Sequence, residues 1–161
     1  MKPLILLGID GVLNPLARAG SPGGPLELVL SDVKVALVNR LAAFGSIAWV
    51  STWPEEQTAG LESQLRLGDE PLRVPLPVRA LSESEAPTPK LRSVTRWLAR
   101  MELSGEVTWD SVVWIDDVLG PDAHEWAHGF RHQVLLVKPV PAEGLTEAHI
   151  VAVEVFVQSG S

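Results

Sequence analysis

The alternation of hydrophobic and polar positions along the chain predicts a parallel α/β sheet. Short apolar runs at residues 3–8, 46–50, 111–115 and 133–137 have the length of buried strands, and stretches of helical periodicity lie between them. Strands that alternate with helices are typical of βαβ units. We therefore expect a three-layer, Rossmann-like α/β core with a mainly parallel five-stranded sheet.

The helices are predicted from their start and stop signals. Ser31 is a suitable N-cap for a helix that runs to Phe44, with Val33, Leu37 and Leu41 on its buried face. The other helices are expected at residues 54–67, 89–101, 121–127 and 146–158.

Two stretches rich in Gly or Pro interrupt this pattern. Residues 15–25 predict a loop, which follows a turn and hairpin after the first strand. Residues 69–89 are rich in proline and include an extended piece over 74–81 that is expected to form a short strand. Thr88, at the end of this stretch, is expected to cap the next helix. Neither stretch is long enough for a large additional domain, so we expect a single domain over residues 1–161.

Composition and charge narrow the possible functions. The chain has a net charge of -7 and a pI of about 5.0, which argues against non-specific binding to nucleic acids or anionic membranes. It contains no Cys, which excludes disulfides and thiolate metal sites. The first apolar run is too short for a signal peptide or a membrane span, so we expect a cytoplasmic protein. The six Trp are expected to pack in the core and its rim rather than stack on bases.

Polar side chains interrupt the apolar context at four points along the chain. Because the carboxyl ends of parallel strands meet at one edge of a sheet, we expect these side chains to converge. Hydroxyl and ammonium groups can hold phosphoryl oxygens, while carboxylates hold Mg²⁺, which offsets the charge of an anionic substrate. The four points are Asp10, the Ser51-Thr52 pair, Lys90, and the Asp116-Asp117 pair.

The order of these four points resembles the motifs of the haloacid dehalogenase (HAD) superfamily. The segments GVLNP (11–15), WVSTW (49–53), WIDD (114–117) and GLTEAH (144–149) look like a small capless HAD-like family common in actinobacteria. That family is similar to the HAD domain of RNA-repair proteins. The resemblance spans roughly residues 3–157 and implies a phosphohydrolase-type fold without a large cap domain.

The resemblance also implies roles for the polar residues around a phosphoryl group. Asp10 would be the general acid that protonates the leaving group, and its main-chain carbonyl would face Mg²⁺. Ser51, or its neighbour Thr52, would bind the phosphoryl group, and Lys90 would neutralise charge. Gly8 departs from the pattern, because the family has its nucleophilic Asp at this position.

The metal site is implied in the same way. Asp116 would ligate Mg²⁺, with Asp117 as a second ligand or as a hydrogen-bond acceptor behind it. Gly8 removes one anionic ligand, so Mg²⁺ binding should weaken. It also leaves Lys90 without the nucleophile's carboxylate, which adds uncompensated positive charge to the crevice.

Two functions follow from this pattern. In the first, the domain lacks the covalent step and binds a phosphorylated small molecule, macromolecule or partner without cleaving it. In the second, it is an active Mg²⁺-dependent phosphatase, in which Asp10 activates water directly or Gly8 replaces a natural Asp. Loss of a covalent nucleophile typically removes several orders of magnitude in rate, which favours the first.

Each polar residue also has a purely structural interpretation. Asp10 can form a turn with Gly11, Ser51 can cap the helix that begins at residue 54, and Lys90 can be a solvated helix lysine. The Asp116-Asp117 pair can cap the helix that follows it.

A rival motif lies in residues 124–128. His124-Glu125-x-x-His128 matches the zinc metallopeptidase helix, in which two His bind zinc and Glu is the base. Gly129 and the strand expected from Gln133 leave this helix short, so we expect a polar helix face instead.

Overall fold

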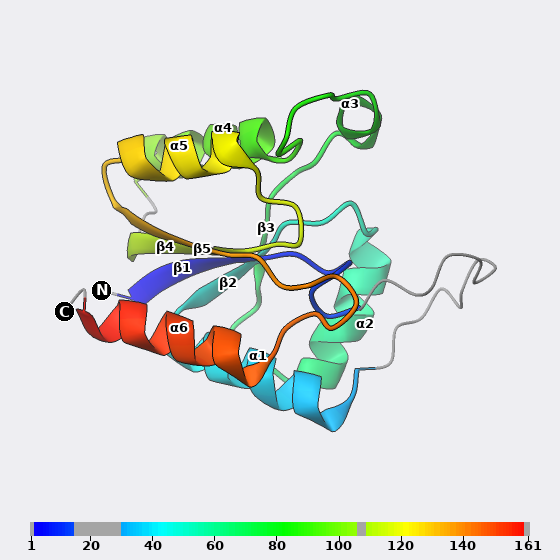
Figure 1. The fold of residues 1–161 in the computed structure, drawn as a ribbon. Helices are drawn as coiled ribbons and strands as arrows, with labels where there is room; N and C mark the ends of the chain where they lie inside the picture. The colour runs from blue at the N-terminus through cyan, green and yellow to red at the C-terminus, as the bar shows by residue number, and fades with distance from the viewer. Residues whose placement is uncertain (1, 15–29, 106–108, 160–161) are drawn as a thin grey trace.

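The structure is a computed structural model that describes residues 2–14, 30–105 and 109–159. Its sheet has the strand order β3-β2-β1-β4-β5, and every neighbouring pair is parallel. The prediction of a parallel five-stranded sheet is therefore confirmed (Figure 1). The strands are β1 Lys2–Leu7, β2 Ser46–Trp49, β3 Leu72–Arg73, β4 Trp109–Ile115 and β5 Gln133–Val137.

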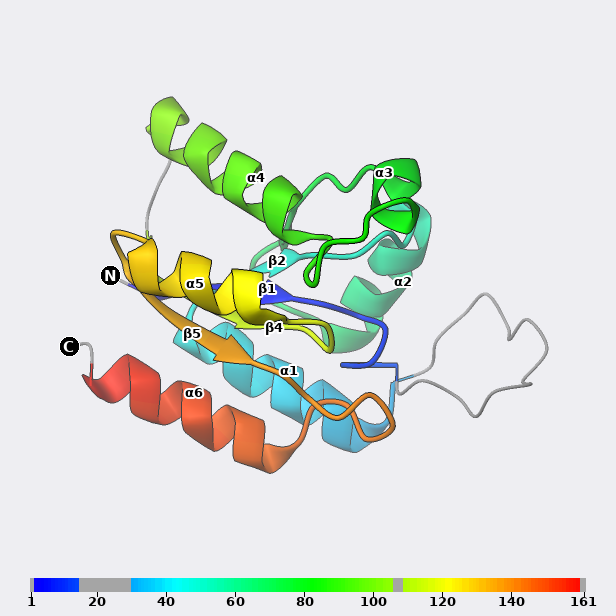
Figure 2. The same cartoon turned by 45° about the horizontal axis from the view of Figure 1, so that its top comes forward.

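Helices cover both faces of the sheet and complete a three-layer sandwich. α4 and α5 lie over one face, and α1 and α6 lie over the other (Figures 1 and 2). The described residues add no large cap domain to this core, as the resemblance implied. The helices are α1 Asp32–Phe44, α2 Glu55–Leu65, α3 Val78–Ser82, α4 Leu91–Ser104, α5 Pro121–Gly129 and α6 Glu147–Ser159.

The central strand explains why the first apolar run contains no polar position. In β1, Ile5 and Leu7 pack in the cluster formed with α1, α2 and α6, while Leu4 and Leu6 pack in the cluster formed with α4 and α5. All four side chains are fully buried. A strand that is covered on both faces cannot alternate apolar with polar residues, so it reads as a continuous hydrophobic run.

The predicted cap of α1 is confirmed, but its buried face is shifted. The Ser31 hydroxyl accepts a hydrogen bond from Lys34 N at 3.2 Å. Leu37 and Leu41 are buried as expected, whereas Val33 is 67% exposed. Val38 completes the buried face, and the half-buried Lys34 donates from its ammonium to the carbonyl of Glu143 at 2.9 Å.

Two predictions for the proline-rich stretch are wrong. The strand expected over 74–81 is instead β3, at Leu72–Arg73, followed by the short helix α3. Val74, Leu76 and Val78 alternate with prolines, which mimics a strand, but proline has no N–H to donate to a sheet. Thr88 does not cap α4, because Lys90 occupies the N-cap position without a side-chain cap bond.

Only part of the turn and hairpin expected after β1 lies within the described residues. A turn follows β1, with a bridge between Asp10 and Asn14. The remainder of the expected hairpin and the loop over residues 15–25 lie outside the described residues. Across the described segments, no helix has the length and apolar character needed to cross a membrane.

Candidate phosphate site at the carboxyl ends of the strands

The ends of three adjacent strands place the predicted motifs side by side. Gly8 follows β1, and its N–H donates to the carbonyl of Ile115, the last residue of β4, at 2.9 Å. Val50 follows β2, and its N–H donates to the carbonyl of Leu7 at 2.9 Å. The sheet ladder therefore continues beyond the assigned strands and fixes the backbone of all three motifs. This edge is where open α/β sheets bind ligands.

Lys90 joins two of these strand ends. Its ammonium lies 2.9 Å from Oδ2 of Asp116 and donates to the carbonyl of Val50 at 3.3 Å. The Asp116 side chain is fully buried, whereas that of Lys90 is 22% exposed. The expectation that Lys90 adds uncompensated charge is therefore wrong, because Asp116 takes the place of the missing nucleophile as its partner. The interpretation of Lys90 as a solvated surface lysine is equally excluded.

The space above Gly8 is small and faces Asp116. A Cβ atom built on Gly8 would lie 3.1 Å from Oδ2 of Asp116 and 3.5 Å from the carbonyl oxygen of Ile115. The distance to Asp116 Oδ2 is a few tenths of an ångström shorter than an ordinary van der Waals contact. A side chain at this position would thus meet the Lys90–Asp116 pair, and the pair would have to shift slightly.

The carboxylate of Asp10 accepts a hydrogen bond from Trp53, for which the sequence predicts only a packing role in the core or its rim. The indole N–H of Trp53 donates to Oδ2 of Asp10 at 3.0 Å, and the Asn14 amide donates to Oδ1 at 3.3 Å. Arg73, in β3, donates to the main-chain carbonyl of Trp53 and anchors it. No short sequence pattern could have revealed this contact, because 43 residues separate the two partners.

Ser51 is buried and does not cap the helix that follows it. The residue is only 5% exposed, and its Oγ accepts a hydrogen bond from Trp53 N at 3.0 Å. α2 begins at Glu55 with Pro54 as its N-cap residue, so Ser51 does not cap it. The neighbouring Thr52 is exposed.

Asp116 and Asp117 form a coupled pair of carboxyl groups. Burial, together with the hydrogen bond and charge of Asp116, raises the pKa of Asp117 to about 6 against the opposing charge of Lys90. Neither residue caps α5, whose N-cap is Gly120. Gly11 makes room for this pair, because it has a φ of 76° and a Cβ there would overlap the Asp117 carboxylate.

The described residues hold no group of three His, Asp, Glu or Cys side chains arranged to bind a metal ion. Asp116 and Asp117 supply two adjacent carboxylates, while the carboxylate of Asp10 accepts a hydrogen bond from Trp53. In the rival zinc motif, His124 and His128 are both exposed on α5. His132 lies 3.5 Å from Glu102 and packs edge-on against Trp109.

Hydrogen bonds around Thr88, which we call the clasp, position Lys90 relative to the end of β4. The Thr88 hydroxyl donates to Oδ1 of Asp122 at 2.6 Å and accepts from Gly120 N at 2.7 Å. The Thr88 N–H donates to Oδ2 of the same carboxylate at 3.1 Å. Thr88 is 1% exposed, so this buried clasp ties the residues before α4 to the residues before α5. No local sequence pattern indicates this contact, because the partners are 34 residues apart.

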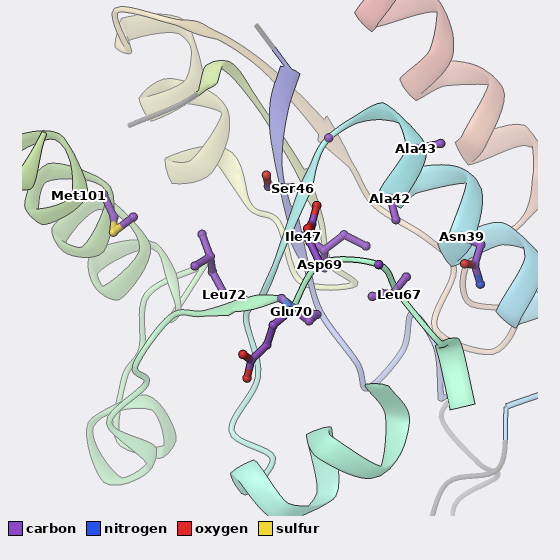
Figure 3. Close-up of a pocket in the computed structure, with 13 residues that line it drawn as sticks. Asn39, Ala42, Ala43, Ser46, Ile47, Leu67, Asp69, Glu70, Leu72 and Met101 are labelled. Carbon is purple, nitrogen blue, oxygen red and sulfur yellow. The ribbon is translucent and has the colours of Figure 1, made fainter. Parts of the chain in front are cut away.

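A second hollow lies away from this site. A cavity of about 530 Å³ opens where β2 begins, between Ser46, the Leu67–Glu70 segment and Met101 of α4 (Figure 3). Asp69 and Glu70 come from the loop before β3, and none of the lining residues belongs to the four motifs. The chemistry of the motifs is therefore confined to the carboxyl ends of the strands.

The protein is a Rossmann-like α/β domain with hydroxyl, lysine and paired carboxylate groups near the carboxyl ends of its parallel strands, where open α/β sheets bind ligands. A family model described as "HAD domain in Swiss Army Knife RNA repair proteins" matches residues 4–150. The chain belongs to this family, which indicates a phosphohydrolase-type function and a group of proteins that generally use Mg²⁺. Comparisons with curated proteins and with solved structures gave no match.

Proposed function

We propose that this protein is a HAD-type domain that binds a phosphorylated ligand at the strand ends and does not carry out the covalent phosphoryl-transfer step. The observation that carries the proposal is the juxtaposition of Gly8 with the Lys90–Asp116 pair. The position of the nucleophile has no side chain, and the lysine that would serve it is bound to another carboxylate. The Ser51 hydroxyl, the Lys90 ammonium and the Asp10 carboxylate support binding of a phosphoryl group at this edge.

The remaining groups suit binding. The Ser51 hydroxyl accepts from Trp53 N, so its own proton is available to a phosphoryl oxygen. Lys90 keeps one N–H group beyond the two that face Asp116 and the Val50 carbonyl, and its side chain is 22% exposed. Asp10 is exposed and oriented by Trp53. These three side chains would face the ligand from the ends of β1 and β2 and from the start of α4.

Asp116 and Asp117 would hold Mg²⁺ if it binds. The charges of two neighbouring carboxylates repel each other, and a divalent cation would offset this repulsion. Mg²⁺ accepts water for its remaining ligands. When bound, it would supply positive charge to the phosphoryl oxygens. With two carboxylates in place of three, we expect weak binding.

The decisive experiment compares the protein with its Gly8→Asp variant against an aryl phosphate in the presence of Mg²⁺. We expect turnover in the variant and none above background in the protein itself, while both bind inorganic phosphate by ³¹P NMR titration. Ser51→Ala should weaken phosphate binding, with Thr52→Ala as the matched control because Thr52 is exposed beside it.

Three outcomes would contradict the proposal. Equal turnover in both proteins, abolished by Asp10→Asn, would identify an active phosphatase that uses water directly. Activity abolished by a zinc chelator but insensitive to Mg²⁺ removal would revive the metallopeptidase-like motif. Absence of phosphate binding in both proteins would remove the ligand site itself.

A further inference from the structure

Three exposed arginines form a stripe along α4 that the phosphate site does not use. Arg92, Arg96 and Arg100 follow one another at intervals of four residues, which places them on one helix face about 6 Å apart. We call them the arginine stripe. In the described part of the chain, none of the three makes an ion pair, whereas Arg40, Arg79 and Arg131 each pair with a glutamate. The stripe is thus unneutralised in a chain of net charge -7.

The stripe borders two adjoining grooves with apolar walls. A groove of about 340 Å³ is lined by Arg96, Arg100, Leu76 and Trp97. A second groove of about 700 Å³ is lined by Arg92, Arg96, Leu81 and Leu91. Both are lined by Pro77, Ser93 and Arg96, so the two grooves adjoin along α4, and we call the pair the channel. Figure 2 shows α3 beside the first turns of α4.

We propose that this channel binds an extended acidic peptide segment of another protein. Every second side chain of an extended peptide points to the same side, and these side chains lie about 6.6 Å apart, which is close to the spacing of the stripe. A segment that alternates acidic with apolar residues would therefore present its carboxylates to the arginines and its apolar side chains to the opposite wall. Arginine suits this role because its planar guanidinium binds carboxylates in a bidentate manner.

The channel fits a peptide better than a nucleic acid. Proteins that bind single strands combine basic grooves with exposed aromatic rings on which bases stack. Every Trp and Phe of this chain is buried or half-buried, and Trp97 in the channel is only 7% exposed. Asp122 lines the second groove as well, but its carboxylate is bound to Thr88 and to Ala123 N and so belongs to the framework.

The test is a fluorescence-anisotropy titration of the protein with a labelled peptide of about seven residues that alternates Glu with Val or Pro. We expect saturable binding that weakens as salt is added. The double variant Arg96→Gln/Arg100→Gln should bind about five- to twentyfold more weakly, since each exposed pair contributes modestly. The matched control Lys2→Gln/Lys138→Gln removes the same charge from exposed positions elsewhere and should bind as the unmodified protein does.

Each other outcome overturns the proposal. Equal weakening by the two double variants would show that net charge, rather than the channel, attracts the peptide. Tighter binding of a single-stranded oligonucleotide or of polyphosphate than of the peptide would assign the channel to a different class of partner. Absence of saturable peptide binding, with both variants folded by circular dichroism, would leave the stripe as a solvated helix face. Phosphate binding at Ser51 is measured separately, so failure here leaves the proposed function unaffected.

Discussion

The ammonium of Lys90 lies 2.9 Å from Oδ2 of Asp116 and bridges the start of α4 to the end of β4. The two partners differ in solvent access, because Asp116 is fully buried while Lys90 is 22% exposed. Removing the lysine would leave a buried carboxylate without its cation, whereas removing the carboxylate would leave a lysine that still reaches water. The two substitutions should therefore destabilise the protein unequally.

We predict that Lys90→Met lowers the free energy of unfolding by about 3 kcal/mol, the typical effect of breaking a buried pair. Asp116→Asn should lower it by roughly 1 kcal/mol, because the Asn oxygen still accepts from Val118 N. The double variant should be more stable than the sum of the two losses implies. Urea unfolding of the four proteins measures this coupling, and additive losses would show that the pair contributes nothing as a unit.

Asp117 should make stability depend on pH. Its pKa is raised from 3.8 to about 6 in the folded protein, so the folded state holds the proton more tightly than the unfolded chain does. The stabilising contribution of this group is therefore fully present below about pH 4 and is lost as pH rises through about 6. Asp117→Asn stays neutral throughout, so its Tm relative to the unmodified protein should rise between these pH values.

Two comparisons sharpen this measurement. Asp110→Asn alters an exposed aspartate and should show no such trend relative to the unmodified protein. Because Mg²⁺ binds the ionised carboxylate, any increase in Tm caused by Mg²⁺ should be larger at pH 7.5 than at pH 5. A pH-independent difference between Asp117→Asn and the unmodified protein would show that Asp117 titrates normally.

The sequence could predict the strands and the edge at which the motifs meet, since buried parallel strands are marked by apolar runs that end in polar residues. It could not predict which polar groups pair. The expected partner of Lys90 was a vacant position, yet the placement of α4 over the sheet brings Lys90 to Asp116. The strand expected over 74–81 had the right alternation, but its prolines cannot donate to a sheet.

Thr88 illustrates how a tertiary contact overrides a local signal. A threonine before a helix predicts an N-cap, but its hydroxyl instead bonds to Asp122 and Gly120. We predict that Thr88→Val lowers the free energy of unfolding by about 1–3 kcal/mol, because it leaves the buried Gly120 N–H without its acceptor and leaves Oδ1 of Asp122 with only the Ala123 N–H. Thr88→Ser retains the hydroxyl and should lose less. Thermal denaturation distinguishes them, and equal losses would mean that the methyl group matters and the clasp does not.

Two substitutions at Gly8 separate the effect of a larger side chain on stability from the effect of an added carboxylate. Gly8→Ala adds only a Cβ, which would lie 3.1 Å from Asp116 Oδ2 and requires a small shift, so we expect a loss of about 1 kcal/mol or less. Gly8→Asp adds a third carboxylate beside Asp116 and Asp117, where like charges repel and water is scarce. Without Mg²⁺ it should be less stable than Gly8→Ala by about 2 kcal/mol.

Mg²⁺ should reverse that order. A third carboxylate completes the anionic ligand set that the present side chains lack, so Mg²⁺ should raise the Tm of Gly8→Asp more than that of the unmodified protein or of Gly8→Ala. Thermal denaturation with and without Mg²⁺ gives the comparison, and Ca²⁺ serves as a test of selectivity because it accepts a larger, looser oxygen shell. If Mg²⁺ stabilised all three proteins equally, position 8 would lie outside the metal site, and its glycine would then reflect packing against Asp116 rather than the loss of a ligand.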